Sequence, residues 1–122
     1  MRNLLRALDA IAPGEPCVIG GDFNTKALPR GEGERHLLEA PDRDEPLFAD
    51  LARAGFTWAG ANLALPTQTP GPTNKHAPPF GKLDWIVVRG LAAANPRIVP
   101  AVDAQGRAVS DHEMLTVDIR IP

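Results

Sequence analysis

The chain has 122 residues, of which 43% are hydrophobic and 23% are charged. These values predict one domain with a modest core and exclude an intrinsically disordered chain. The net charge of −2 excludes the global positive field that dominates nucleic-acid affinity. The single cysteine, Cys17, excludes an intramolecular disulfide, and the scattered histidines offer no paired ligands for structural zinc. No apolar run approaches a membrane span, so we expect a soluble chain, cytoplasmic by default.

The first predicted elements are a helix, a buried strand and a second helix. Apolar residues at helical spacing predict an amphipathic helix over residues 4–11. The short apolar run of residues 17–20, bounded by proline and glycine, predicts a buried strand. Residues 46–53 predict a further helix, with Gly55 available for a left-handed stop.

The later elements are predicted to be strands. Residues 83–88 form the strongest strand pattern, residues 98–99 together with Val102 fit a short strand, and residues 115–121 alternate as a half-buried final strand. Residues 56–60 also fit a short strand. The segments between these elements are rich in proline, glycine and charge, and they predict long loops that border any site, with room for a helical turn at residues 36–39. The order of elements indicates an α/β (α+β) fold.

Two polar residues follow the first predicted strand. The segment Gly20-Gly21-Asp22-Phe23-Asn24 places an acid and an amide two positions apart where that strand ends. Glycines at this point let the backbone turn sharply and let a ligand approach closely. Asp and Asn also form turns without any ligand, by bonding to their own backbone. Taken alone, the segment fits a catalytic loop and a plain turn equally.

A second polar segment, Ser110-Asp111-His112, comes directly before the last predicted strand. An acid followed by a histidine at such a junction fits a catalytic pair. Ser-Asp is also ordinary turn chemistry, and a histidine beside a strand is commonly a surface or hydrogen-bonded residue. Taken alone, this segment slightly favours the turn.

Asp84 stands near the start of an otherwise apolar strand. A carboxylate is costly to bury unless another group bonds to it. A histidine would serve, because a carboxylate on one imidazole nitrogen fixes the tautomer and leaves the other nitrogen for a substrate. The alternative is an acid at the strand edge that bonds to Lys82 or to a loop amide.

In this order and spacing, the three segments resemble the endonuclease/exonuclease/phosphatase superfamily of metal-dependent phosphoesterases. The resemblance covers nearly the whole chain, including both predicted helices. It implies a four-layer α-β-β-α sandwich, of which residues 1–122 are a single domain corresponding to the C-terminal half. That half consists of one mixed, mainly antiparallel sheet with two helices on one face. The N-terminal half, with the family's principal metal-binding glutamate, has no counterpart in this sequence.

The resemblance also implies a role for each matched residue in the attack of water on a phosphoester. Asp22 matches the acid that orients or deprotonates the water, and Asn24 matches the amide that helps to hold the phosphoryl group. His112 matches the histidine that bonds to the phosphoryl oxygens, and Asp84 matches the acid that positions this histidine. Asp111 matches an acid close to the metal, which Asp22 and Asn24 also adjoin.

Because the principal metal ligand is not found, we expect the chain to bind Mg²⁺ or Mn²⁺ weakly and to be inactive or nearly so. Half of a sandwich leaves one sheet face open, and Trp85, Ile86 and Val88, or their neighbours, are expected to form an apolar patch there. A second copy of the chain, as a homodimer, or a complementing N-terminal half would cover this face. The alternative function is a non-catalytic interaction or dimerisation domain that keeps the scaffold.

Overall fold

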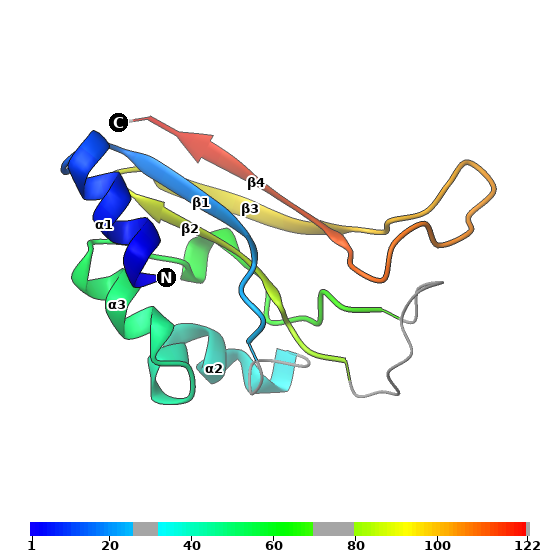
Figure 1. The fold of residues 1–122 in the computed structure, drawn as a ribbon. Helices are drawn as coiled ribbons and strands as arrows, with labels where there is room; N and C mark the ends of the chain where they lie inside the picture. The colour runs from blue at the N-terminus through cyan, green and yellow to red at the C-terminus, as the bar shows by residue number, and fades with distance from the viewer. Residues whose placement is uncertain (26–31, 70–79, 122) are drawn as a thin grey trace.

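The computed structural model describes residues 1–25, 32–69 and 80–121, and it has an α+β fold (Figure 1). The described ranges contain short 3-10 turns, three α-helices and four β-strands. The helices and strands are α1 (Arg2–Ile11), β1 (Cys17–Asp22), α2 (Arg35–Glu39), α3 (Leu47–Arg53), β2 (Asp84–Arg89), β3 (Ala92–Val99) and β4 (Met114–Arg120).

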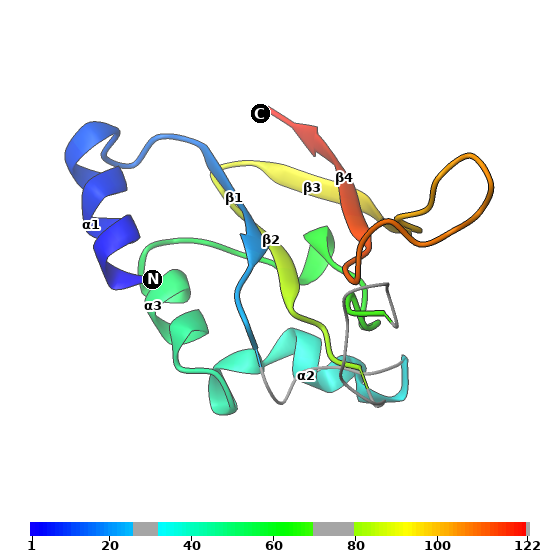
Figure 2. The same cartoon turned by 45° about the vertical axis from the view of Figure 1, so that its right-hand side comes forward.

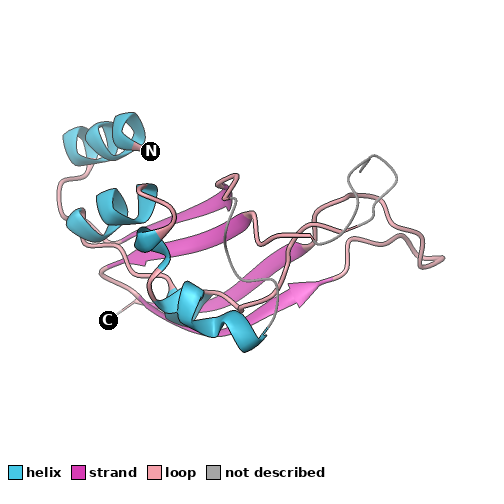
Figure 3. Cartoon of the chain, turned by 90° about the horizontal axis from the view of Figure 1, so that it is seen from below, coloured by secondary structure: helices cyan, strands magenta, loops and turns pink. Residues whose placement is uncertain are grey.

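The helices gather on one side of β1 and β2, and the β3–β4 hairpin lies on the other side (Figures 1 and 2). Figure 3 shows the same arrangement from below. The core lies between the helices and β2, where Trp85 and Phe48 are fully buried with ring centroids 4.7 Å apart. Burial of large aromatic side chains is the main stabilising contribution available to a core of this size. In β1, Ile19 packs against this core, while Val18 faces outward and is 46% exposed.

Both edges of β2 are occupied. On one edge, β1 pairs with it in antiparallel register, with Asp22 opposite Asp84. On the other edge, the side chain of Asn62 exchanges hydrogen bonds with the backbone of Ile86, and Thr57 exchanges backbone hydrogen bonds with Val88. The segment between α3 and β2 therefore takes the place at which a neighbouring strand would pair.

For this reason the strands form two antiparallel two-stranded sheets, β1–β2 and β3–β4, and not the single sheet that the sequence suggested. Gly90, with φ of 64°, turns the chain sharply between β2 and β3. In β3 a bulge lies between Ala94 and Arg97, and it contains Asn95 with φ of 53°. The sequence predicted only the end of β3, because Ala, Asn and Pro are poor strand formers.

The α/β class predicted from the sequence is confirmed, as are both long helices and the first, strongest and last strands, but the first strand was expected to be buried and is largely exposed. Three α-helices are present where two were expected, because the helical turn suggested at residues 36–39 is a short helix, α2, and residues 56–60 contain an isolated bridge at Thr57 and no strand. The expected apolar patch was wrong in part: Trp85 is buried in the core with the helices, and Val88 is also buried. The exposed apolar side chains of the strands and the C-terminus are instead Val18, Met114 and Ile121.

Within the described ranges, no helix has both the length and the apolar character needed to cross a membrane. Most of the proline-rich loop, and part of the charged loop after Asn24, lie outside the described residues. The prediction that these loops border the site therefore stays a prediction.

Candidate active site

The end of β1 and the start of β2 bring two carboxylates together. Asp22 is the last residue of β1, Asp84 is the first residue of β2, and the two are partners in the register. The Phe23 amide donates to the Leu83 carbonyl at 2.8 Å, so the next pair, Asp22 and Asp84, is a non-hydrogen-bonded pair. Side chains of such a pair approach each other closely. Like charges placed directly opposite are destabilising, which creates a demand for a cation at this point.

His112 meets that demand. Its Nδ1 lies 2.8 Å from Oδ2 of Asp84, and the two side chains are 28% and 18% exposed. Burial lowers the pKa of His112, but the hydrogen bond and charge of Asp84, with the charges of Asp22 and Asp111, outweigh it. The net effect raises the pKa of His112 above its usual value. The arrangement therefore favours an imidazolium fixed by a carboxylate.

A short segment before the proline-rich loop brings His112 to Asp84. Thr67 is fully buried, and its Oγ1 accepts hydrogen bonds from the amides of Leu83 and Asp84 at 2.9 and 3.0 Å. Its carbonyl accepts from the Glu113 amide at 2.8 Å. Thr67 thus links the start of β2 to the residue before β4, which fixes the distance across which Asp84 and His112 bond.

The turn after β1 is held by its own side chains. Gly21 has φ of 152°, a conformation that other residues rarely adopt. The Asn24 amide donates to Oδ1 of Asp22 at 2.7 Å, and Asn24 has φ of 52°. Asn tolerates this left-handed conformation better than most residues. Asp22 and Asn24 therefore form the turn that the sequence suggested as the alternative, and they also lie at the site.

Buried polar groups support this turn from below. Thr25 is 2% exposed, and its hydroxyl donates to the Lys82 carbonyl and accepts from Nε1 of Trp85. Lys82 is fully buried, and its Nζ donates to the Asp84 carbonyl at 3.0 Å and lies 4.7 Å from the Trp85 ring centroid. Burial lowers the pKa of Lys82 to about 7, although the Asp84 charge opposes the shift.

Of the residues predicted from the sequence, the structure brings Asp22, Asp84 and His112 together, with Asn24 bonded to Asp22. Asp111 lies next to His112 in the chain, and its carbonyl accepts from the Thr69 amide. The sequence reasoning missed the parts played by Thr25 and Thr67, and it named Lys82 only as an alternative partner of the Asp84 carboxylate, whereas Lys82 bonds to the Asp84 carbonyl. A lysine directly before an apolar strand was a signal for Lys82, whereas a threonine in a proline-rich stretch gave none for Thr67.

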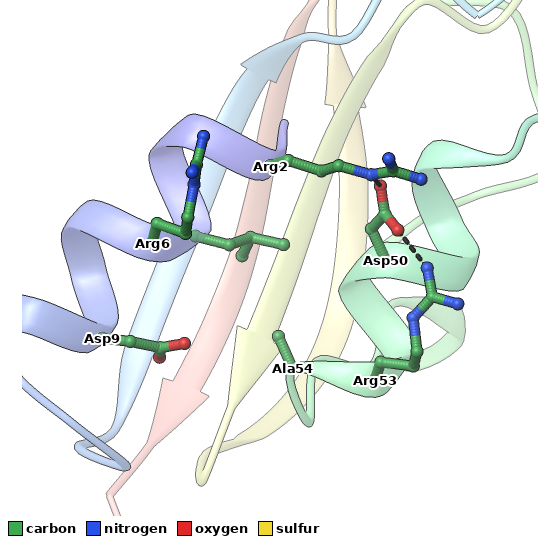
Figure 4. A pocket seen from close by; sticks show the side chains of 7 residues that line it. Arg2, Arg6, Asp9, Asp50, Arg53 and Ala54 are labelled. Carbon is green, nitrogen blue, oxygen red and sulfur yellow. Dashed lines mark hydrogen bonds and ion pairs between the residues drawn. The ribbon is translucent and has the colours of Figure 1, made fainter.

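A cavity of about 230 Å³ adjoins this pair of strands and is lined in part by Asp84 and Glu113. A larger cavity, of about 610 Å³, lies between α1 and α3. Figure 4 shows that Asp50 in this larger cavity is held between the guanidinium groups of Arg2 and Arg53. The pair between Arg2 and Asp50 joins α1 to α3, whereas the pair between Arg53 and Asp50 lies within α3, so we assign the larger cavity to the scaffold.

A histidine bound to one carboxylate and lying beside a second, where β1 ends and β2 begins, can orient water and neutralise a phosphoryl oxygen. The model of the Endonuclease/Exonuclease/phosphatase family matches residues 2–112, which include all of these groups. The chain belongs to this family. No curated protein and no solved structure matched the chain. Family membership indicates a phosphoesterase-type hydrolase that acts on phosphoester or nucleic-acid substrates.

The endonuclease/exonuclease/phosphatase family generally depends on a divalent metal ion. In the described ranges, however, no group of three or more His, Cys, Asp and Glu side chains is arranged to hold a metal. Asp22 also uses one carboxylate oxygen to close its own turn. The donor set of the described residues therefore does not make a complete metal site.

Proposed function

We propose that this chain forms one side of a metal-dependent phosphoester hydrolysis site, in which Asp22, Asn24, Asp84, Asp111 and His112 act on a phosphoryl group. The observation that carries this proposal is the 2.8 Å contact between His112 Nδ1 and Asp84 Oδ2, beside the carboxylate of Asp22. A carboxylate-bound histidine that also feels the charge of a second carboxylate matches the needs of phosphoryl transfer, which are positioning and neutralisation of charge.

His112 supplies the positive charge. Asp84 holds the imidazole by Nδ1 and raises the pKa of His112, so the protonated form persists to higher pH than in a free imidazole. The remaining nitrogen, Nε2, then donates its proton in a hydrogen bond to a phosphoryl oxygen as negative charge builds there. A preorganised donor of this kind typically contributes on the order of a hundredfold to a thousandfold in kcat.

Asp22 and Asn24 act on the other side of the phosphorus atom. Asp22 orients the attacking water and takes its proton while the water oxygen forms a bond to phosphorus and the ester P–O bond breaks. The Asn24 side-chain amide holds a phosphoryl oxygen. The hydrogen bond from the backbone amide of Asn24 to the carboxylate of Asp22 supports this assignment, because it fixes the two residues relative to each other.

Mg²⁺ or Mn²⁺ is the ion we propose for the complete reaction, with Asp22, Asn24 and Asp111 as its ligands from this chain. Mg²⁺ prefers oxygen ligands and keeps several waters, so a partial set of this kind binds it weakly. When bound, the ion neutralises charge on the phosphoryl group. Because the described donor set is incomplete, we expect turnover by this chain alone to be weak or undetectable.

Hydrolysis of bis(p-nitrophenyl) phosphate at millimolar Mg²⁺ or Mn²⁺ tests the proposal. We expect any activity to be abolished by EDTA and to fall about a hundredfold or more in His112→Ala. His36→Ala is the matched control, because His36 is exposed on α2. Activity that survives in His112→Ala, or that falls equally in His36→Ala, would contradict the assignment.

A second candidate is a non-catalytic interaction domain that keeps the scaffold. It is favoured by the incomplete donor set and by the exposed apolar side chains Val18 and Met114, which are 46% and 54% exposed. A homodimer, or a complementing N-terminal half, would cover these side chains. A pure preparation without turnover at millimolar metal, which also sediments as a dimer that Val18→Asp dissociates, favours this candidate.

Nucleic acid is one of the substrate classes of the family, but the net charge of −2 gives no general attraction to it. A strong decrease of DNA affinity with rising salt concentration would identify a local basic surface and favour a nuclease. An affinity that does not change with salt favours a small phosphoester substrate.

A further inference from the structure

Asp84 makes no ladder hydrogen bonds with β1 through its own backbone, because it belongs to a non-hydrogen-bonded pair. Its amide and carbonyl point to the opposite edge of β2. There the amide is bonded by Oγ1 of Thr67, and the carbonyl is bonded by Nζ of Lys82, at 3.0 Å in both contacts. Two side chains, both fully buried, thus hold the peptide from which the Asp84 carboxylate is directed at His112.

Burying the Lys82 ammonium group to bond one backbone carbonyl costs free energy of folding. An ammonium group is strongly hydrated, and burying it without a paired carboxylate opposes folding. Among the described residues, its direct contacts are a neutral carbonyl and the face of the Trp85 ring, and the charge of Asp84 offsets only part of the cost of burial. Burial accordingly lowers the pKa of Lys82 to about 7. An apolar side chain of the same length, such as methionine, would pack against Trp85 without this penalty.

A buried cation that disfavours folding, placed on the peptide of a site residue, indicates a role in the site. We propose that Lys82 is a positioning residue: its buried Nζ holds the Asp84 carbonyl, and together with Thr67 it fixes the backbone from which the Asp84 carboxylate binds His112. This inference rests on the proposed function for its catalytic consequence. The structural part, that Lys82 controls the contact between Asp84 and His112, stands without it.

The second route by which Lys82 acts on the site is through its own peptide. The Lys82 carbonyl accepts the Thr25 hydroxyl, and Thr25 directly follows Asn24. A single residue therefore contacts the turn that carries Asp22 and Asn24 as well as the strand that carries Asp84. Replacing only the side chain of Lys82 leaves this backbone contact in place, so the two routes separate experimentally.

The test compares Lys82→Met, Lys82→Arg and Arg89→Met in the full chain. Methionine keeps the length of the stem and removes the donor, whereas arginine keeps an N–H donor. Arg89→Met is the control, because Arg89 is also a buried cation but stands at the other end of β2. The readouts are the melting temperature at pH 7 and the proton resonance of His112 Nδ1–H, which is displaced downfield when the proton is shared with a carboxylate.

We expect Lys82→Met to melt at the same temperature as the wild type or higher, and to lose the displaced His112 resonance. Lys82→Arg should keep the resonance, and so should Arg89→Met, measured at a temperature at which it is folded. Retention of the resonance in Lys82→Met overturns the proposal. A large drop in its melting temperature also overturns it, because Lys82 would then serve the fold.

The catalytic consequence is measured separately. Where the wild type turns over bis(p-nitrophenyl) phosphate, Lys82→Met should lower kcat about tenfold or more and change KM little, because it misplaces a group that acts in the transition state. If His112→Ala leaves turnover unchanged while the His112 resonance still depends on Lys82, the hydrolase proposal fails and the positioning role stands. Unchanged kcat in Lys82→Met, with the activity dependent on His112, overturns the positioning role in catalysis.

Discussion

Strand β2 has a buried cation at each end, and the two cations are bonded in different ways. At its far end the guanidinium of Arg89 donates to the carbonyls of Ala12, Glu15 and Ala54, and it pairs with Asp9. At its near end Lys82 donates to one carbonyl and lies against a ring. Arg89 joins three segments of the scaffold, whereas Lys82 supports the single peptide from which Asp84 binds His112.

Buried charge therefore has two roles in this small domain: Arg89 stabilises the scaffold, and Lys82 supports the backbone of a site residue. A guanidinium with several fixed donors can satisfy several carbonyls at once, so Arg89 recovers the free energy lost when it leaves water. An ammonium with one carbonyl does not recover it. Lys82, at the near end of β2 beside the site, therefore lowers the stability of the fold, whereas Arg89, at the far end, raises it. The predictions that follow separate the two ends.

The largest expected effect is the pH dependence of stability due to Lys82. The pKa of Lys82 is about 7 in the folded chain, below the 10.5 of an exposed lysine. The free-energy cost of burying the charged ammonium group is therefore fully present below pH 7. Between these two values the unfolded chain binds the proton and the folded chain does not, so stability rises with pH. We therefore compare the free energy of unfolding of the wild type with that of Lys82→Met. Between pH 7 and pH 10, this difference should shift by ~4 kcal/mol in favour of the wild type.

Urea denaturation at a series of pH values measures this difference, and the subtraction of the Lys82→Met series removes the contribution of all other groups. A difference that does not change with pH would show that Lys82 is not a buried titrating group.

The next effect is the loss of stability in Arg89→Met. Three carbonyls lose a donor near a side chain that is 9% exposed, which should lower the free energy of unfolding by about 3 kcal/mol. Arg97→Met is the matched control, because its pair with Asp118 is exposed and should contribute less than about 1 kcal/mol. Equal losses in the two variants would contradict the assignment of Arg89 to the scaffold.

A smaller effect is expected at Thr67. Thr67→Val keeps the shape of the side chain and leaves the amides of Leu83 and Asp84 without their acceptor, at a cost of about 2 kcal/mol in the free energy of unfolding. Thr57→Val serves as the control, because Thr57 is exposed and contributes its backbone to the bridge with Val88. Chemical denaturation of both variants gives the comparison, and a neutral Thr67→Val would remove Thr67 from the account of how β2 reaches β4.

The sequence predicted the near end of β2 better than the architecture around it. Asp84 was conspicuous because a carboxylate in an apolar strand needs a partner, and His112 was the histidine that the family resemblance supplied. The separation into two sheets was not predictable, because it depends on Asn62 and Thr57 occupying the edge of β2 from a segment without a strand pattern. The same limit hid Thr67, whose hydroxyl matters only because the chain returns to that edge.

Local patterns also misplaced some exposed groups. Trp85 and Val88 were expected on an open face, but both are buried, and Trp85 packs in the core with the helices. An apolar run such as residues 85–88 does not tell which of its two faces is covered, since covering depends on where distant helices pack. The alternation in β1, with Ile19 inward and Val18 outward, became interpretable once the helices were in place.

The contact between Asp84 and His112 is the central claim, and an NMR titration of the His112 imidazole in the wild type and in Asp84→Asn tests it most directly. The hydrogen bond and charge of Asp84 raise the pKa of His112. The contact therefore stabilises the fold fully at a pH below the pKa of His112 in the unfolded chain, and this stabilisation is lost as the pH rises through the pKa of His112 in the folded chain. We predict a wild-type pKa above that of a free imidazole and a clear decrease in Asp84→Asn. Equal values in the two proteins would contradict the account.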